Sequence, residues 1–223
     1  MTCFKKISES ILDIFFPPLC LICGKYLEKR GSSEPICKIC SDKIIIHRYP
    51  EKIKDLVIRA ATDYRDKNIK SLIRLLKYKN FKTISITLGR LLSEHLAYEN
   101  IDPKKTIIVP IPLHPSKEKE RGYNQSELIA NAVSKRLGIN IQTKILRRIK
   151  KGKPQASIED HKKRVLNIHG AFAAGKENHL ATGKTIILID DVFTSGATMK
   201  EAIREIRKMK PHKIIPAVVA IAR

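Results

Sequence analysis

Two adjacent aspartates, Asp190 and Asp191, end an apolar run in the segment 186–198, which reads IILIDDVFTSGAT. An ionised carboxylate beside apolar side chains is costly unless a cation, a ligand or hydrogen-bond donors compensate it. Carboxylates in such a position can hold a divalent cation or accept hydrogen bonds from sugar hydroxyls. The pair is therefore the first candidate for a binding site.

A short polar loop follows the acids and leads into a helix that we predict to begin near Ala197. The first turn of a helix presents free backbone N–H groups and the positive end of the helix dipole, and both favour an anion. The residues expected to hold a phosphate there are Thr194, Ser195, Gly196, Ala197 and Thr198. A phosphate at the loop and hydroxyls at the acids together indicate a sugar phosphate. An ordinary capped turn is the alternative interpretation.

Four of the five cysteines form two C-x-x-C pairs, and the ligands expected from them are Cys20, Cys23, Cys37 and Cys40. Each pair can direct two thiolates at one ion, so the two pairs predict a closed, structural Zn²⁺ site. The polar segment between the pairs is too short for a core of its own, so bound metal would supply its folding energy. Two disulfides are the alternative, which a reducing compartment disfavours. We expect Cys3 to be a small apolar residue.

The elements that must position these residues alternate between strands and helices. Buried strands are predicted over 56–64, 106–112, 185–190 and 213–222. Apolar residues at helical spacing predict helices over 68–78, 84–96, 124–137 and 197–209. This order predicts an α/β domain with a mainly parallel sheet flanked by helices, whose ligands gather at the carboxyl ends of the strands. We therefore expect an N-terminal helix and four-cysteine zinc module over 1–45, and the α/β domain over 46–223.

The composition is that of a folded and strongly basic protein. Its 223 residues are 43% hydrophobic, which is enough to bury a sizeable core and argues against disorder. The 44 Lys and Arg residues exceed the 22 Asp and Glu residues, and the formal net charge is +22. This excess favours an anionic partner such as nucleic acid, a phosphorylated metabolite or an acidic membrane surface. A generally basic host proteome is the alternative explanation.

The N-terminal segment does not resemble a secretion signal. Glu9, Asp13 and the pair Pro17-Pro18 interrupt its apolar stretch, and the apolar runs elsewhere are only as long as strands. We expect a cytoplasmic protein with no integral membrane segment. One helical face of this segment carries Phe4, Ile7, Ile11, Ile14 and Phe15. Docking of this face on the parent domain is expected, and contact with a partner or with the inner face of the membrane is the alternative.

The segment 186–198 closely resembles the phosphoribosyl pyrophosphate signature of type I phosphoribosyltransferases. From about residue 11 to the end, the chain resembles the ComF family in particular. The resemblance rests on the cysteine pairs that follow FFPP, on LLKYKN at 75–80, on VPIPLHPSKEKERGYNQSELIA at 109–130 and on KPQASIEDHKKRVLNIHGAF at 153–172. It implies a type I phosphoribosyltransferase-like fold with a small zinc-ribbon-like module, in a family associated with DNA uptake during natural transformation.

The resemblance also implies roles for individual residues. The two acids would meet the ribose hydroxyls of phosphoribosyl pyrophosphate, the loop would hold its 5′-phosphate, and Mg²⁺ would bridge the ribose and the pyrophosphate. If the fold is catalytic, the two acids are the candidate catalytic residues, and pyrophosphate is displaced from the anomeric carbon through a cation-like transition state. Family position places the pyrophosphate near Tyr78, Lys79, Asn80, Arg121 and Gln125. His114 is a candidate contact for the leaving group, with an exposed loop histidine as the alternative.

Single-stranded DNA is the expected polymer partner. The stretches 114–125 and 147–164 are the densest in basic residues, and the second has few large apolar side chains, so it is expected to be a solvated loop. Lys and Arg side chains can neutralise backbone phosphates, and an aromatic ring can stack on an unpaired base. The expected DNA contacts are Lys117, Lys119, Arg121, Tyr123, Arg147, Arg148, Lys150, Lys151 and Lys153.

Two functions therefore stay open at this point. The first is a competence-type protein that binds single-stranded DNA and phosphoribosyl pyrophosphate and works with partner proteins of the uptake machinery. The second is a phosphoribosyltransferase of nucleobase salvage that acts on a soluble base. The zinc module, the positive charge and the family resemblance favour the first, because a salvage enzyme needs none of them.

Overall fold

The computed structural model describes residues 17–27, 34–150 and 168–222. The chain divides into two compact units, Met1–Ile45 and Ile46–Arg223. The predicted apolar face near the N-terminus, Cys3, and the basic residues Lys151 and Lys153 lie outside the described residues. The second unit contains the sheet and both acids of the candidate sugar phosphate site.

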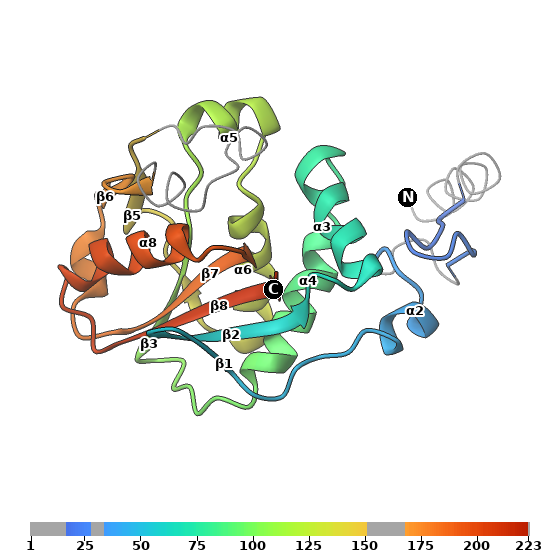
Figure 1. Ribbon diagram of the computed structural model, residues 1–223, viewed down its shortest axis with the longest axis horizontal. Helices are drawn as coiled ribbons and strands as arrows, with labels where there is room; N and C mark the ends of the chain where they lie inside the picture. Colours follow the sequence, from blue (N-terminus) through green and yellow to red (C-terminus); the bar gives the residue numbers. More distant parts are fainter. Residues whose placement is uncertain (1–16, 28–33, 151–167, 223) are drawn as a thin grey trace, which may run out of the picture. The chain divides into compact units, whose positions relative to one another are not determined.

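A six-stranded sheet in the order β1-β2-β8-β7-β3-β4 forms the centre of the second unit (Figure 1). Its strands are β1 (Glu51–Ile53), β2 (Leu56–Asp63), β3 (Thr106–Pro110), β4 (Asn140–Ile141), β7 (Thr185–Phe193) and β8 (Lys213–Ile221). All neighbouring strands are parallel except the β1–β2 hairpin. The carboxyl ends of β2, β3, β7 and β8 therefore lie at the same end of the sheet, together with the two acids in β7.

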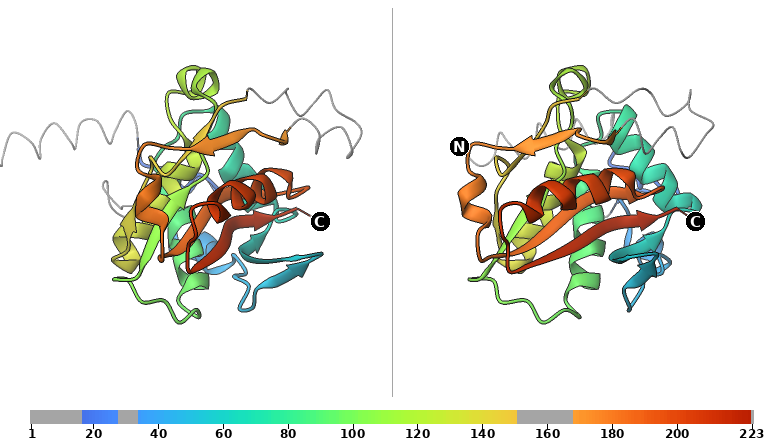
Figure 2. Two further views of the ribbon diagram at one scale, coloured as in Figure 1. Left: turned by 90° about the vertical axis from the view of Figure 1, so that its left-hand side faces the viewer. Right: turned by 60° about the vertical axis from the view of Figure 1, so that its left-hand side comes forward.

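Helices cover both faces of this sheet, which explains why its central strands are apolar throughout. In β7, the four residues 186–189 have no exposed surface. Helices α4 (Ile84–Leu96) and α6 (Gln125–Leu137) pack on one face, and α8 (Ala197–Arg207) lies over the other (Figure 2). The two helices of the first face approach closely at Gly89, where an added Cβ would lie 2.4 Å from another side chain.

Two further helices follow the carboxyl ends of strands. Helix α3 (Lys67–Tyr78) follows β2, and the carboxylate of Asp66 accepts the backbone N–H groups of Asn68 and Ile69 at its start. Helix α5 (Pro115–Arg121) follows β3. The other described elements are α2 (Lys38–Asp42), β5 (Leu146–Arg148), β6 (Phe172–Ala174) and the 3₁₀ helix η2 (Asn178–Ala181).

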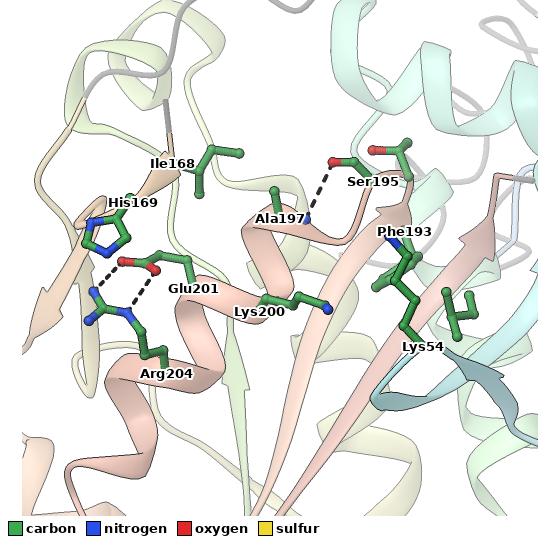
Figure 3. A pocket seen from close by; sticks show the side chains of 11 residues that line it. Lys54, Ile168, His169, Phe193, Ser195, Ala197, Lys200, Glu201 and Arg204 are labelled. Carbon is green, nitrogen blue, oxygen red and sulfur yellow. Dashed lines mark hydrogen bonds and ion pairs between the residues drawn. The ribbon is translucent and has the colours of Figure 1, made fainter. Parts of the chain in front are cut away.

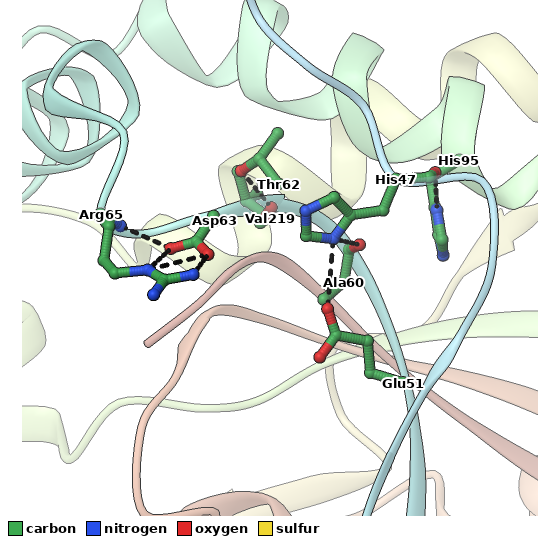
Figure 4. A network of polar contacts seen from close by, with 8 residues as sticks. All are labelled: His47, Glu51, Ala60, Thr62, Asp63, Arg65, His95 and Val219. Carbon is green, nitrogen blue, oxygen red and sulfur yellow. Dashed lines mark hydrogen bonds and ion pairs between the residues drawn. The ribbon is translucent and has the colours of Figure 1, made fainter. Parts of the chain in front are cut away.

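A polar network around two histidines fastens the start of the second unit to β2 and α4 (Figure 4). The Nδ1 atom of His47 lies 3.1 Å from the carbonyl oxygen of Ala60 and 3.4 Å from a carboxylate oxygen of Glu51. The Nδ1 atom of the buried His95 lies 2.6 Å from the carbonyl oxygen of His47, so Nδ1 of His95 carries the proton and donates. Burial lowers the pKa of His95, which therefore acts as a neutral structural residue.

The predicted α/β architecture with a mainly parallel sheet is confirmed. The helix expected over 84–96 has these bounds, and the helix expected to end before Gly138 does so, with Gly138 at φ +66°. Helix α5 was not predicted, because its stretch of the sequence was considered only for its charge. Its start carries ordinary helix signals: Pro115 is its first residue, and His114 caps it by accepting the N–H of Ser116.

Candidate functional site

Asp190 is half-buried at the carboxyl end of β7, and two donors hold one of its oxygens. The hydroxyl of Ser126 donates to Oδ1 of Asp190 at 2.8 Å, and the backbone N–H of Asp191 donates to the same oxygen at 2.9 Å. Ser126 is 1% exposed and lies in the first turn of α6, so the start of that helix fixes the carboxylate. Sequence reasoning missed Ser126, although it directly follows the motif GYNQ.

Asp191 is 4% exposed, and its partner is a lysine that sequence reasoning also missed. The Nζ atom of Lys77 lies 2.7 Å from Oδ2 of Asp191. Lys77 lies in the last turn of α3, directly before Tyr78, at which the helix ends. The protein itself therefore supplies a cation for one of the two acids.

The two acids consequently differ in their electrostatics. Burial, and then the charge of Asp191, raises the pKa of Asp190 to about 6, although Lys77 and Ser126 oppose this shift. Burial alone would lower the pKa of Lys77, but the carboxylate of Asp191 outweighs it and the pKa of Lys77 is raised. At neutral pH the site contains one ion pair and one carboxylate that ionises at a cost, which an added cation or hydroxyl donors would offset.

The motif GYNQS after α5 joins the elements that converge on this site. The hydroxyl of Tyr123 donates to the carbonyl oxygen of Leu76, near the end of α3. The side-chain amide of Asn124 donates to the carbonyl oxygen of Ile111 at 3.1 Å, directly after β3. Ser126 then reaches the acid in β7. The motif therefore connects the carboxyl ends of two neighbouring strands to the end of α3.

The expectation that Tyr123 stacks on an unpaired base is wrong in this structure. Tyr123 is only 7% exposed, and the Nζ atom of Lys82 lies 5.1 Å from the centre of its ring. The aromatic residues that do face solvent nearby are Tyr78, which is 71% exposed, and Phe81, which is 43% exposed. A ring that is buried to fix a loop cannot also serve as a stacking surface.

The residues predicted near the pyrophosphate lie in two neighbouring segments. Arg121 donates to the side-chain oxygen of Gln125, and its guanidinium lies 5.8 Å from the centre of the Tyr78 ring. Lys79 is the C-cap of α3, and Asn80 follows it with φ +58°, a left-handed conformation that Asn tolerates better than most residues. The structure thus brings Tyr78, Arg121 and Gln125 together beside the turn 78–80, and their role with pyrophosphate stays a prediction.

The loop before α8 leaves the start of that helix without a side-chain cap. Its N-cap is Gly196 at φ +75°, and an added Cβ there would lie 2.5 Å from Cζ of Phe193. The hydroxyl of Ser195 lies 3.5 Å from the backbone N of Ala197, a long contact that leaves this N–H free for a better acceptor. Thr198 is half-buried in the first turn. Hydroxyls and backbone N–H groups around an open helix start are suited to a phosphate.

A hollow of about 390 Å³ lies beside this loop and is lined partly by α8 (Figure 3). The exposed Thr194 contributes to its wall. Two of its cations are already paired: Lys200 with Asp55, and Arg204 with Glu201 at 2.6 Å. These pairs weaken that side of the hollow as an anion site, so the wall that Ser195 and Ala197 form at the start of α8 is the stronger candidate for the phosphate.

The residues predicted to contact DNA fall into two groups. Lys119, Arg147 and Lys150 are exposed, and Lys117 is half-buried. Arg148, in contrast, packs with its guanidinium 5.5 Å from the centre of the Phe172 ring. Burial lowers the pKa of Arg148, and the charge of Asp190 opposes this shift. Arg148 therefore interacts electrostatically with Asp190 and is a weaker candidate for contact with DNA.

The four predicted zinc ligands lie together in the first unit. The Sγ atoms of Cys20, Cys23, Cys37 and Cys40 all lie within 4.8 Å of one another. Those of Cys23 and Cys37 are 3.8 Å apart, and the four cysteines are free thiols. A tetrahedron with Zn–S bonds of about 2.3 Å has sulfur atoms about 3.8 Å apart. The cluster is therefore compatible with structural Zn²⁺.

Backbone N–H donors stabilise negative charge on a sulfur atom of this cluster, which favours the binding of a cation. The N–H of Cys37 donates to Sγ of Cys20 at 3.3 Å. Burial alone would raise the pKa of Cys20, but N–H donors from its own turn and from Cys37 outweigh it, and the pKa falls to about 6. Burial and the neighbouring thiols raise the pKa of Cys40 to about 12. A bound Zn²⁺ would compensate all four thiolates, which the protein alone does not.

Comparison with known proteins agrees with this geometry. Residues 123–223 match the phosphoribosyl transferase domain family. Competence protein F of Haemophilus influenzae is 32% identical over 150 residues, which cover 64% of this chain and 63% of that protein. Competence protein ComFC of Bacillus subtilis is 32% identical over 108 residues, which cover 45% of this chain and 38% of that protein. The chain is related to the ComF competence proteins.

A longer match covers most of the chain at lower identity. The DNA utilization protein YhgH of Salmonella typhi is 24% identical over 191 residues, which cover 82% of this chain and 81% of that protein. The matches to the first two ComF relatives span less than two thirds of the length of those proteins. The predicted type I phosphoribosyltransferase fold with an N-terminal four-cysteine cluster is confirmed. Within the described part of the chain, no helix is long and apolar enough to cross a membrane.

Proposed function

We propose that this ComF relative is a DNA-handling protein of natural competence that binds phosphoribosyl pyrophosphate with Mg²⁺. The observation that carries the proposal is the position of Asp190. Its carboxylate is half-buried, has a pKa raised to about 6, and ends a strand whose following loop opens the start of α8. A carboxylate that needs compensation beside an open helix start matches the two ends of a ribose phosphate.

Different residues of the chain would bind different parts of the ligand. Asp190 accepts hydrogen bonds from the ribose hydroxyls, and the loop 194–198 holds the 5′-phosphate. The turn 78–80 and Arg121 face the pyrophosphate. Mg²⁺ usually binds through one or two carboxylates together with substrate phosphates, and Asp190 provides such a carboxylate. When bound, the ion would neutralise charge on the pyrophosphate.

Thermal unfolding with a set of ligands tests this assignment. We expect phosphoribosyl pyrophosphate with Mg²⁺ to raise the melting temperature most, because it alone engages every part of the site. Ribose 5-phosphate should raise it less, and pyrophosphate with Mg²⁺ should compete with the complete ligand. Equal shifts with inorganic phosphate alone would reduce the site to a general anion site and contradict the proposal.

Single-stranded DNA is the proposed polymer partner, bound through exposed basic residues and solvent-facing aromatic rings. The net charge of +22 supports an anionic polymer, and Lys119, Arg147 and Lys150 are exposed. Tyr78 and Phe81 replace Tyr123 as the candidate stacking residues, because their rings reach solvent. Fluorescence anisotropy of a labelled oligonucleotide over a range of salt concentrations tests this. A steep loss of affinity with salt supports phosphate contacts, and a flat profile contradicts them.

Nucleobase salvage is the alternative that the same experiments separate from this proposal. A salvage enzyme would release pyrophosphate when supplied with phosphoribosyl pyrophosphate and a free base, and it would not need to bind DNA. Pyrophosphate release with one soluble base, together with no binding of single-stranded DNA at low salt, would favour salvage over the competence role.

A further inference from the structure

The ion pair between Lys77 and Asp191 is built into the candidate site before any ligand arrives. Their charged atoms lie 2.7 Å apart, and the two side chains are 22% and 5% exposed respectively. An ammonium and a carboxylate at this distance in a buried setting attract each other far more strongly than a surface pair does. Removing one partner leaves a buried charge without compensation, so the pair is expected to persist when the ligand binds.

The neighbouring acid is held differently. Asp190 receives hydrogen bonds from the hydroxyl of Ser126 and from a backbone N–H, both at Oδ1. Neither donor carries a formal charge, so the negative charge of Asp190 is less fully compensated than that of Asp191. The two acids are adjacent in β7 but face different partners, because successive side chains of a strand point to opposite sides.

We propose that Lys77 is the internal counter-ion of Asp191 and that this ion pair gives the two acids different roles in binding. In this arrangement Asp190 is the carboxylate that meets the ribose hydroxyls and Mg²⁺, and Asp191 is a positioning residue held by Lys77. The inference rests on the proposed function, and it goes further by giving the two acids different roles.

The position of Lys77 gives the pair a second role. Lys77 directly precedes the turn 78–80, which is the candidate contact for the pyrophosphate. The ion pair between Lys77 and Asp191 therefore fixes that turn relative to the end of β7. The hydroxyl of Tyr123 binds the carbonyl of Leu76, so a second contact fixes the same part of α3. Together these contacts set the spacing between the ribose end and the pyrophosphate end of the site.

A double-mutant cycle on the melting temperature of the ligand-free protein tests the first half of the inference, which is the coupling between Lys77 and Asp191. The variants are Lys77→Met, Asp191→Asn and the two together, with Lys70→Met as a control on an exposed position of the same helix. We expect each single variant to lower the melting temperature by about 4 °C or more, because it leaves a buried charge unpaired. The double variant should recover at least half of the summed loss, and the control should change little. Additive losses would mean that the pair is not coupled and would overturn the inference.

Calorimetric titration of phosphoribosyl pyrophosphate with Mg²⁺ tests the second half. Asp190→Asn should lose at least about tenfold in affinity while it stays folded. The double variant Lys77→Met with Asp191→Asn should lose clearly less affinity than Asp190→Asn, about threefold, because neither group contacts the ligand directly and the bond from Tyr123 to Leu76 still fixes the end of α3. A double variant that folds but loses as much affinity as Asp190→Asn would show that Asp191 is a direct ligand, and this would overturn the division of roles.

The two experiments also separate this inference from the proposed function. If the unmodified protein binds no phosphoribosyl pyrophosphate, the proposed function fails, and the assigned roles of the two acids fail with it. The double-mutant cycle would then still decide whether Lys77 and Asp191 form a coupled structural pair. If the unmodified protein binds the ligand and the double variant does not, only the division of roles fails.

Discussion

Asp190 and Asp191 are neighbours in sequence, but the protein compensates their negative charges to different degrees. Asp191 is buried and shares an ion pair with Lys77, whereas Asp190 is held by a hydroxyl and a backbone N–H and has a pKa of about 6. The free energy of unfolding should therefore depend on pH through Asp190. A site that keeps one carboxylate partly uncompensated loses stability without ligand and gains binding energy with it.

The first prediction concerns Asp190→Asn. The folded pKa of about 6 lies above the ordinary Asp value of about 3.9, so the folded state binds this proton more tightly than the unfolded state. Asp190 therefore lowers the free energy of unfolding as the pH rises from about 4 to about 6. At pH 7 the variant should be more stable than the unmodified protein by about 1 to 3 kcal/mol, and this difference should vanish near pH 4.

Urea denaturation at a series of pH values measures this effect. Asp102→Asn is a suitable control, because the side chain of Asp102 is 51% exposed and lies 4.0 Å from its lysine partner. The control should show no comparable change between pH 4 and pH 6. A stability difference for Asp190→Asn that is the same at every pH would show that this carboxyl does not have the raised pKa.

At the scale of elements, the site depends on how loops leave the carboxyl ends of parallel strands. The loop after β7 turns sharply at Gly196, packs against Phe193 and opens the start of α8. The segment after β3 supplies Tyr123 and Ser126, which reach α3 and β7. The loop and the motif therefore act as one unit, because both position groups around the same carboxylate.

The second prediction tests the loop with Gly196→Ala. This position has φ +75°, and the new methyl group would also meet the Phe193 ring at 2.5 Å. Gly138→Ala is the matched control, because it has φ +66° but no heavy atom within 4 Å of the new Cβ. The control should lose about 1 kcal/mol of stability from backbone strain alone. Gly196→Ala should lose more, about 2 to 4 kcal/mol, and should also weaken binding of ribose 5-phosphate.

Chemical denaturation and phosphate-competition titrations of the two glycine variants provide the measurement. Equal losses of stability would mean that the ring of Phe193 moves aside easily and that only the left-handed backbone matters. Unchanged affinity of Gly196→Ala for ribose 5-phosphate would remove the loop from the site.

Several elements were predictable because their sequence signals are local. The apolar strand before Asp190, the helix 84–96 and the helix that ends at Gly138 all follow from periodicity and capping residues. Lys77 was not predictable, because its partner lies over a hundred residues away and a lysine in the last turn of a helix is usually an exposed capping residue. Tyr123 was misjudged because the surrounding charge suggests solvent, whereas its ring packs inside to fix the motif.

At the scale of the whole molecule, the chain combines a small unit that depends on cysteines with a larger unit that has an apolar core. In the first unit, the described residues bury only four large hydrophobic or cysteine side chains, which are Cys20, Ile36, Cys40 and Ile44. So small a core cannot supply the stability that the parallel sheet gives the second unit. We therefore expect the two units to respond differently to loss of metal.

The third prediction is that Cys37→Ser loses bound zinc and unfolds the first unit while the second unit keeps its fold. Removal of one thiolate leaves an incomplete tetrahedron, which lowers metal affinity and the folding energy that depends on it. Metal analysis by mass spectrometry and tryptic digestion provide the measurement, with Cys3→Ser as the control that should keep one zinc per chain. Equal zinc content in the Cys37→Ser variant and the unmodified protein would contradict the prediction.

The fourth prediction concerns DNA and uses charge reversal at two places. Changing Lys150, Lys151 and Lys153 to Glu should weaken binding to single strands of any sequence and flatten its salt dependence. Changing Arg207, Lys210 and Lys213 to Glu alters the net charge by the same amount between the end of α8 and the start of β8. Anisotropy titrations should show a much smaller loss for this second variant. Equal losses would attribute binding to the overall charge and not to the basic loop.

The central claim is that the carboxyl end of β7 binds phosphoribosyl pyrophosphate together with Mg²⁺. Isothermal titration calorimetry of the unmodified protein and of Asp190→Asn, each with and without Mg²⁺, tests it most directly. We predict one ligand per chain, binding that requires Mg²⁺, and at least about tenfold weaker affinity for the variant, which corresponds to about 1.4 kcal/mol. Binding that is independent of Mg²⁺, or equally tight in a folded Asp190→Asn variant, would contradict this account of the site.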